Sequence, residues 1–108
     1  MNYFAYKNNE LFCEDINLQE IAQKFGTPSY IYSKKTIESN IDDYKNAFKK
    51  KDNLICFSVK SLSNISILNI LREKGCGFDI VSGGELQRAL YVKTNPKKIV
   101  FSGVGKSN

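Results

Sequence analysis

Three short apolar segments alternate with amphipathic segments in the second half of the chain, and this alternation limits the possible folds most strongly. The apolar segments lie at residues 54–59, 78–81 and 98–101. Between them, residues 64–74 and 82–90 place apolar side chains at helical spacing. The segment at 54–59 has no charged residue, as is typical of a strand covered on both faces. The alternation of strands and helices with short connections predicts an α/β fold with parallel strands.

This repeat is too short to form a closed structure. A barrel of parallel strands needs eight strands and typically about 250 residues, whereas the chain has 108 residues and three such segments. Residues 105–108 contain no further strand or helix pattern. We therefore expect the chain to be the N-terminal piece of a longer protein.

The first half of the chain predicts two helices and two extended segments. Residues 3–14 alternate weakly and are expected to be extended, and so is the short apolar stretch at 30–32. Asn17 is a suitable N-cap for a helix that ends before Gly26. A second helix is predicted by an apolar stripe at helical spacing: Ile37, Ile41, Tyr44 and Phe48.

The net charge of +5 raises the possibility of a nucleic-acid partner, but the distribution of the lysines argues against it. The only lysine run, at 49–51, closes a predicted helix, where cations suit the helix dipole. No apolar stretch approaches the roughly 18 residues that span a bilayer, and no signal peptide is visible. The sequence thus predicts a cytoplasmic protein that binds neither nucleic acid nor membrane.

The chain contains no histidine, and this excludes several kinds of site from it. Serine–histidine and cysteine–histidine nucleophile pairs cannot form. The three cysteines are an odd number without a CxxC motif, so we expect neither a disulfide framework nor a metal site. Residues 103–107 resemble part of a nucleotide-binding loop, but Val100 occupies the position where that motif needs glycine. Any chemistry must come from lysine, carboxylates, hydroxyls or a cofactor.

Lys60 is the candidate catalytic residue, because it follows an apolar strand at the end where ligands bind in β/α sheets. Strand alternation would place it on the same face as Ser58, pointing inward. A partly desolvated lysine is an amine nucleophile suited to Schiff-base chemistry. Asp79, on the neighbouring strand, would face the same interior if Phe78 and Ile80 pack outward. Most lysines at strand ends are surface charges, however, so position alone favours that simpler interpretation.

Three sequence blocks resemble one enzyme family. They are ICFSVK at 55–60, GCGFDIVSGGEL at 75–86 and KIVFSGVGKS at 98–107. The resemblance is to the diaminopimelate decarboxylases, which use pyridoxal phosphate and belong to the alanine-racemase-like barrel class. Together with the opening segment, the blocks cover nearly the whole chain in the order and spacing of that family.

The resemblance implies a fold and two site residues. The fold would be a partial (β/α)8 barrel of the TIM type, with residues 33–108 forming the first part of the barrel that binds pyridoxal phosphate. Residues 1–32 would contribute to the start of the barrel and to a β-domain completed by later sequence. Lys60 would be the catalytic lysine that binds pyridoxal phosphate covalently, and Asp79 would lie near it at the cofactor. Relatives often have alanine where this chain has Ser58.

The implied reaction is the decarboxylation of meso-2,6-diaminopimelate to L-lysine and CO₂ in lysine biosynthesis. The enzyme would bind a small amino-acid substrate and act as a homodimer, and the isolated 108-residue piece would be inactive. Two alternatives remain open. One is a related decarboxylase acting on arginine, ornithine or carboxynorspermidine, and the other is a non-catalytic protein that binds pyridoxal phosphate on the same fold. Alanine racemase is disfavoured, because its usual tyrosine-glycine-histidine stretch does not follow Lys60.

Overall fold

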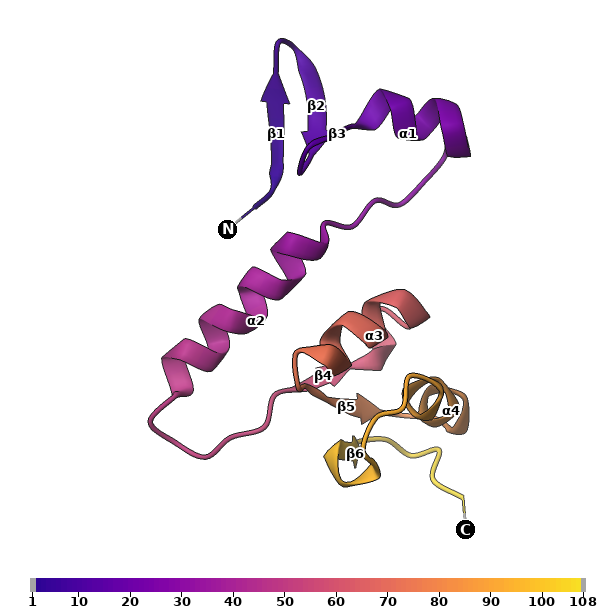
Figure 1. Cartoon of the computed structure of the whole chain (residues 1–108). Helices are drawn as coiled ribbons and strands as arrows, with labels where there is room; N and C mark the ends of the chain where they lie inside the picture. The colour runs from indigo at the N-terminus through magenta and orange to yellow at the C-terminus, as the bar shows by residue number, and fades with distance from the viewer. Residues whose placement is uncertain (1, 108) are drawn as a thin grey trace. The chain divides into compact units, whose positions relative to one another are not determined.

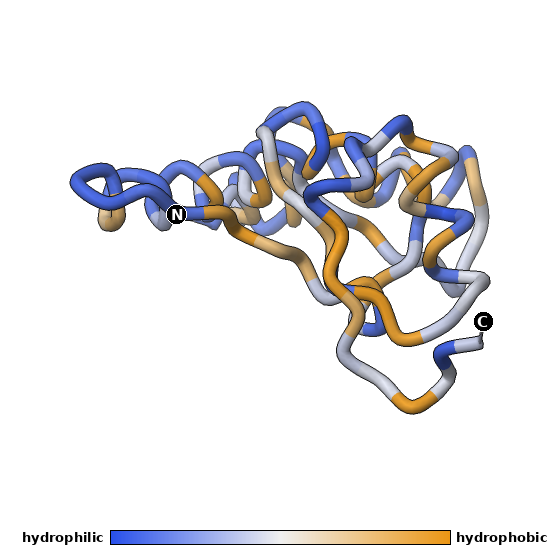
Figure 2. The backbone as a smooth tube through the Cα atoms, turned by 90° about the horizontal axis from the view of Figure 1, so that it is seen from below, coloured by the Kyte–Doolittle hydropathy of each residue, from blue (hydrophilic) through white to orange (hydrophobic). Residues whose placement is uncertain are grey.

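A computed structural model of the chain describes residues 2–107, which belong to two compact units, Met1–Tyr44 and Lys45–Asn108 (Figure 1). Each unit contains a three-stranded sheet. The alternation of apolar and polar stretches along the backbone can be followed in Figure 2. Within residues 2–107, no helix is both long and apolar enough to cross a membrane.

The sheet of the first unit is antiparallel and confirms the extended segment expected near the N-terminus. Strand β1 (Phe4–Lys7) pairs with β2 (Glu10–Cys13), which also pairs with the two-residue strand β3 (Ile16–Asn17). The hairpin turn consists of Asn8 and Asn9, whose φ angles are 50° and 64°. Asparagine tolerates this left-handed conformation better than most residues, which suits a two-residue hairpin turn.

Helix α1 (Leu18–Phe25) begins and ends as predicted. The side chain of Asn17 accepts the backbone N–H of Gln19 at 2.8 Å, and Gly26 ends the helix with a φ of 85°. The expected strand at 30–32 is wrong, because the chain there pairs with no strand in the described part of the first unit. These residues are therefore a connecting segment, and the side chain of Tyr30 is 91% exposed.

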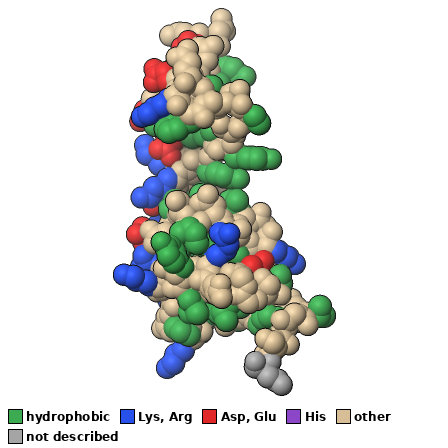
Figure 3. Space-filling view, turned by 90° about the vertical axis from the view of Figure 1, so that its right-hand side faces the viewer, with side chains coloured by type: hydrophobic (Ala, Val, Ile, Leu, Met, Phe, Trp, Pro, Cys, Tyr) green, Lys and Arg blue, Asp and Glu red, His purple; other side chains and the backbone are tan. Residues whose placement is uncertain are grey.

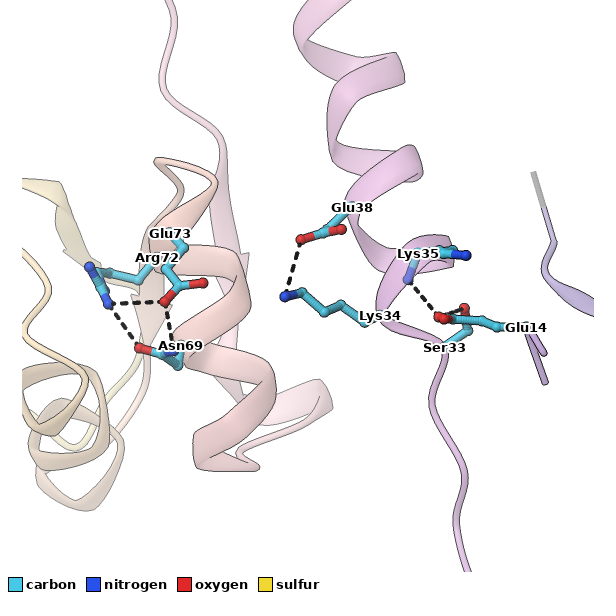
Figure 4. Close-up of polar contacts among 8 residues, drawn as sticks. All are labelled: Glu14, Ser33, Lys34, Lys35, Glu38, Asn69, Arg72 and Glu73. Atoms are coloured by element: carbon cyan, nitrogen blue, oxygen red, sulfur yellow. Dashed lines mark hydrogen bonds and ion pairs between the residues drawn. The ribbon is translucent and has the colours of Figure 1, made fainter. Parts of the chain in front are cut away.

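Helix α2 (Lys34–Phe48) contains the predicted apolar stripe and begins at a polar clamp. The Ser33 hydroxyl accepts the backbone N–H of Thr36 at 3.0 Å and donates to Glu14 Oε1 at 2.9 Å. The same oxygen accepts the backbone N–H of Lys35 at 2.9 Å (Figure 4). These bonds satisfy N–H groups that the first turn of a helix leaves free, and they connect α2 to the end of the hairpin.

The second unit has the predicted parallel α/β arrangement, with the strands in the order β4-β5-β6. Its elements, in chain order, are β4 (Cys56–Ser58), the 3₁₀ turn η1 (Val59–Ser61), α3 (Ile65–Glu73), β5 (Gly77–Ile80), α4 (Gly83–Tyr91), the 3₁₀ turn η2 (Pro96–Lys98) and β6 (Ile99–Phe101). Strand β4 is shorter than the predicted segment at 54–59, because the chain turns into η1 directly after Ser58.

The two faces of this sheet differ in character. Phe57, Phe78 and Ile99 are aligned across the strands on one face, and Phe78 is fully buried together with Leu68 of α3 and Ala89 of α4. Side chains alternate along a strand, so the next row lies on the opposite face. That row consists of Ser58, Asp79 and Val100, none of which is buried. The apolar core thus lies on the helix side, and the row on the open face is less buried and contains two polar side chains.

Several large apolar side chains are at the surface. Phe25, Tyr30 and Tyr91 are more than two-thirds exposed. Figure 3 shows apolar side chains (green) at the surface among the charged ones. Scattered exposure of this kind is common in folded chains and by itself requires no functional explanation.

Candidate functional site

A carboxylate and two hydroxyls meet at the carboxyl end of the parallel sheet. Ser58 ends β4, Asp79 lies in β5 and Ser102 directly follows β6. The Ser58 hydroxyl donates to Asp79 Oδ2 at 3.1 Å, and the Ser102 hydroxyl donates to Asp79 Oδ1 at 2.5 Å. Each carboxylate oxygen therefore accepts one hydrogen bond from a different strand end.

The backbone of the sheet sets this arrangement. Strand pairing places Ser58 opposite Asp79, which fixes the first hydrogen bond. Ser102 is held by its own backbone N–H, which donates to the carbonyl of Ile80 at 3.1 Å and so continues the pairing of β6 with β5. The three side chains are neighbours because three parallel strands end at the same edge.

Lys60 lies at the same end of β4, within η1, and its side chain is exposed. The turn is fixed by the backbone bond from Leu62 N–H to the Val59 carbonyl and by the Ser61 hydroxyl, which donates to the Ser58 carbonyl at 2.7 Å. Val59, in the same turn, is fully buried. A fully buried neighbour and a bonded turn anchor the backbone that carries the lysine.

The expected shelter around Lys60 is not present in residues 2–107. The alternation argument assumed that the strand continues to Val59, but the chain leaves the strand after Ser58 and the strand geometry does not reach Lys60. Asp79 and Lys60 form no ion pair in the described residues, and each oxygen of the carboxylate accepts a hydrogen bond from a serine hydroxyl. The amine is thus accessible rather than desolvated.

The chain that follows Lys60 is held by helix ends. The side chain of Asn64 caps α3 by accepting the N–H groups of Ser66 and Ile67. Arg88 of α4 donates to the carbonyl of Ser63 at 3.0 Å. The segment between Lys60 and α3 is therefore held by hydrogen bonds to the start of α3 and to Arg88 of α4.

Helix α4, which follows β5, has a capping box at its N-terminus. The Ser82 hydroxyl accepts the N–H of Glu85 at 3.2 Å, and Glu85 Oε2 accepts the N–H of Val81 at 2.6 Å. This reciprocal pattern satisfies two N–H groups at the start of α4. It also explains the Ser82–Glu85 motif without a ligand.

Cys56 lies two residues before Ser58 in β4, so its side chain is on the same open face of the sheet. Burial and, to a lesser extent, the negative charge of Asp79 raise the pKa of the Cys56 thiol. Burial also raises the pKa of Cys76, and that of Cys13. Thiols with raised pKa values are protonated at neutral pH, so none of the three cysteines has the thiolate character of a reactive cysteine.

Residues 2–107 contain no cluster of three or more histidine, cysteine, aspartate or glutamate side chains that could hold a metal ion. The side chains that do meet are a carboxylate and two hydroxyls, and the primary amine of Lys60 is carried by the turn at the end of β4. Lys60 lies in the 3₁₀ turn that follows β4, and its side chain is exposed in the described residues. The class defined by the fold and the site is a parallel α/β domain with polar side chains at the carboxyl edge of its sheet.

Comparison with known proteins identifies the family to which this α/β domain belongs. Residues 34–108 match the family described as "Pyridoxal-dependent decarboxylase, pyridoxal binding domain". The chain belongs to this family. Pyridoxal phosphate is accordingly its cofactor.

Similar proteins include diaminopimelate decarboxylases. Diaminopimelate decarboxylase of Haemophilus influenzae is 51% identical over 107 residues, which are 99% of this chain and 26% of that protein. A crystal structure of AQ1208 from Aquifex aeolicus matches 97% of this chain with a TM-score of 0.92 and 46% identity, and the match spans 26% of that structure. Diaminopimelate decarboxylase from M. jannaschii in co-complex with L-lysine matches 96% of this chain and 25% of that structure, with a TM-score of 0.92 and 36% identity. The chain thus spans about a quarter of the length of the relatives it matches, and the TIM-type barrel class is confirmed.

Sequence reasoning identified Lys60 and Asp79 but missed the role of the hydroxyls. The sequence marks Ser58 only as a small neighbour of Lys60, and Ser102 only as the residue at which the third predicted strand ends. The available clue was the position of each residue at or directly after the last residue of a predicted strand. In a parallel sheet, such positions lie next to one another.

Proposed function

We propose that this chain is the N-terminal, cofactor-anchoring part of a decarboxylase that converts meso-2,6-diaminopimelate to L-lysine and CO₂. Lys60 is the catalytic residue that binds pyridoxal phosphate covalently, and Asp79 is a cofactor-binding residue beside it. The observation that carries the proposal is the 51% identity to the Haemophilus influenzae diaminopimelate decarboxylase over nearly the whole chain. Further support comes from the M. jannaschii relative, whose structure contains L-lysine.

Pyridoxal phosphate, when bound, supplies the electron sink that stabilises the carbanion left by loss of CO₂. Lys60 contributes a primary amine that has no ion-pair partner among the described residues and can therefore react. Asp79 contributes a negative charge at the same edge of the sheet.

The proposal includes the organisation of the whole protein. Residues 1–32 contribute to the start of the barrel and to a β-domain, and residues 33–108 form the first part of the barrel. Within the described residues, β4 and β6 each have one neighbouring strand, so both edges of the sheet can accept further strands. The protein acts on a small amino acid as a homodimer in the cytoplasm.

The test is product analysis with the full-length protein that carries this chain. The protein is loaded with pyridoxal phosphate and given meso-diaminopimelate, ornithine, arginine or carboxynorspermidine in separate reactions. We expect CO₂ and L-lysine from diaminopimelate alone, no turnover by the Lys60→Ala variant and normal turnover by Lys97→Ala, which removes an exposed lysine from η2. Residues 1–108 expressed alone should give no product.

Other outcomes of this assay identify the alternatives. Preferential release of CO₂ from ornithine, arginine or carboxynorspermidine would contradict the proposed substrate and indicate a related decarboxylase. Binding of the cofactor without release of CO₂ from any of the four substrates would indicate a non-catalytic protein. Full activity of Lys60→Ala would contradict the assigned role of the lysine.

A further inference from the structure

We propose that Ser58 and Ser102 are positioning residues that hold the Asp79 carboxylate in one orientation at the carboxyl edge of the sheet. This inference rests on the proposed function, because it concerns the carboxylate next to the cofactor-binding lysine. The two serines come from different strand ends, and each occupies a different oxygen of the carboxylate.

The geometry restricts the carboxylate from both sides. Rotation of the Asp79 side chain about its last bond would break both hydrogen bonds at once, because the donors lie on opposite neighbouring strands. Neither donor can follow such a rotation easily. Ser58 is fixed by its pairing with β5, and Ser102 by its backbone hydrogen bond to Ile80.

The same arrangement keeps Lys60 available. A carboxylate beside a lysine commonly forms an ion pair with it, and that pairing would hold the amine in place and compete with its reaction. Here the two hydroxyls satisfy Asp79, and Lys60 forms no ion pair within residues 2–107. The serines thus hold the carboxylate in position, and Lys60 has no ion pair with it in residues 2–107.

The cluster contributes little to the apolar core. Ser102 is exposed, Ser58 and Asp79 are half-buried, and all three are separate from the buried core residues Phe78 and Leu68. Hydrogen bonds at exposed positions contribute modestly to folding, since water replaces them when they are lost. We therefore expect loss of either serine hydroxyl to change the stability of the fold very little.

A double-mutant cycle in the full-length protein tests the inference. Ser58→Ala, Ser102→Ala and the double variant are made with Asp79 intact and again with Asp79→Ala. The Kd for pyridoxal phosphate is measured by equilibrium dialysis, and kcat and KM for diaminopimelate are measured separately. Ser102→Thr keeps a hydroxyl, and Ser66→Ala removes an exposed serine of α3 as a control.

We expect each alanine variant to weaken cofactor binding about tenfold, as is typical for loss of a hydrogen bond to a charged group. Ser102→Thr should restore most of the affinity, and Ser66→Ala should not change it. With Asp79→Ala in place, the serine substitutions should have no further effect, because their effects pass through the carboxylate. The melting temperatures of the serine variants should equal that of the unmodified protein.

Three outcomes would overturn the inference: an unchanged Kd and kcat in the double serine variant, a serine effect that persists with Asp79→Ala, or loss of folding in an alanine variant. Borohydride labelling separates this failure from failure of the proposed function. If Lys60 is labelled in the unmodified protein and the serine variants behave normally, only the positioning role is wrong. If Lys60 is not labelled in the unmodified protein, the proposed function itself is wrong.

Discussion

Replacing Gly77 with alanine should disrupt the sheet that carries Asp79. Gly77 is the first residue of β5 and is buried. An added Cβ would lie 2.1 Å from the carbonyl oxygen of Lys98 and 3.1 Å from Cys56 Sγ. The oxygen belongs to the backbone that leads into β6, so no side-chain movement can relieve the contact.

The size of the effect follows from these distances. A Cβ contact below 3.0 Å is essentially never found, so β5 and the chain before β6 must separate by at least 0.9 Å, the difference between 3.0 and 2.1 Å. Backbone hydrogen bonds of about 2.9 Å do not survive such a displacement. Overpacking of this kind costs roughly 1–3 kcal/mol, and a value of about 2 kcal/mol corresponds to a roughly 30-fold change in the opening equilibrium.

Amide hydrogen exchange in the full-length protein measures this opening locally. We expect the amides of β5 and β6 to exchange about 30-fold faster in Gly77→Ala, if the cost is about 2 kcal/mol. Gly83→Ala is the matched control, because its Cβ would meet nothing within 4 Å and alanine suits the start of α4. Unchanged exchange in Gly77→Ala, or equal acceleration in both variants, would refute the steric argument.

Two further predictions concern stability. Phe78→Ala should destabilise the second unit by about 3–5 kcal/mol, because the side chain is fully buried. Phe25→Ala, at a side chain that is 71% exposed, should change stability by less than about 0.5 kcal/mol. Urea denaturation of the full-length protein compares the two variants. The backbone N–H of Lys35 and the hydroxyl of Ser33 lower the pKa of Glu14. Because the folded-state pKa lies below the unfolded one, Glu14 stabilises the fold above the unfolded pKa, and this contribution is lost as the pH falls through the folded pKa. Glu14→Gln should therefore be less stable near neutral pH and lose less stability on acidification, and denaturation at a series of pH values that shows parallel losses would contradict this.

The sequence patterns predicted the second unit well, because local and tertiary preferences agree there. The three predicted strand segments form parallel strands, and the two predicted helices lie between them. The prediction was wrong for residues 30–32, where apolar and aromatic composition favours a strand. Strand formation also needs a neighbouring strand, and a sequence pattern alone does not reveal whether one is present.

The site was only partly predictable for a related reason. The positions of Lys60 and Asp79 relative to the strand ends could be inferred, because parallel strands present their carboxyl ends at one edge. The exposure of Lys60 could not, because it depends on the turn that replaces the last part of the predicted strand. The hydrogen bond from Ser102 to Asp79 joins residues 23 positions apart, and it depends on a pairing register that the sequence does not specify.

Covalent trapping of the cofactor tests the central claim most directly. The full-length protein is loaded with pyridoxal phosphate, reduced with borohydride and digested, and the peptides are analysed by mass spectrometry. We predict a single pyridoxyl group on Lys60, and its loss in Lys60→Ala. A pyridoxyl group on another of the lysines, with Lys60 unmodified, would contradict the account.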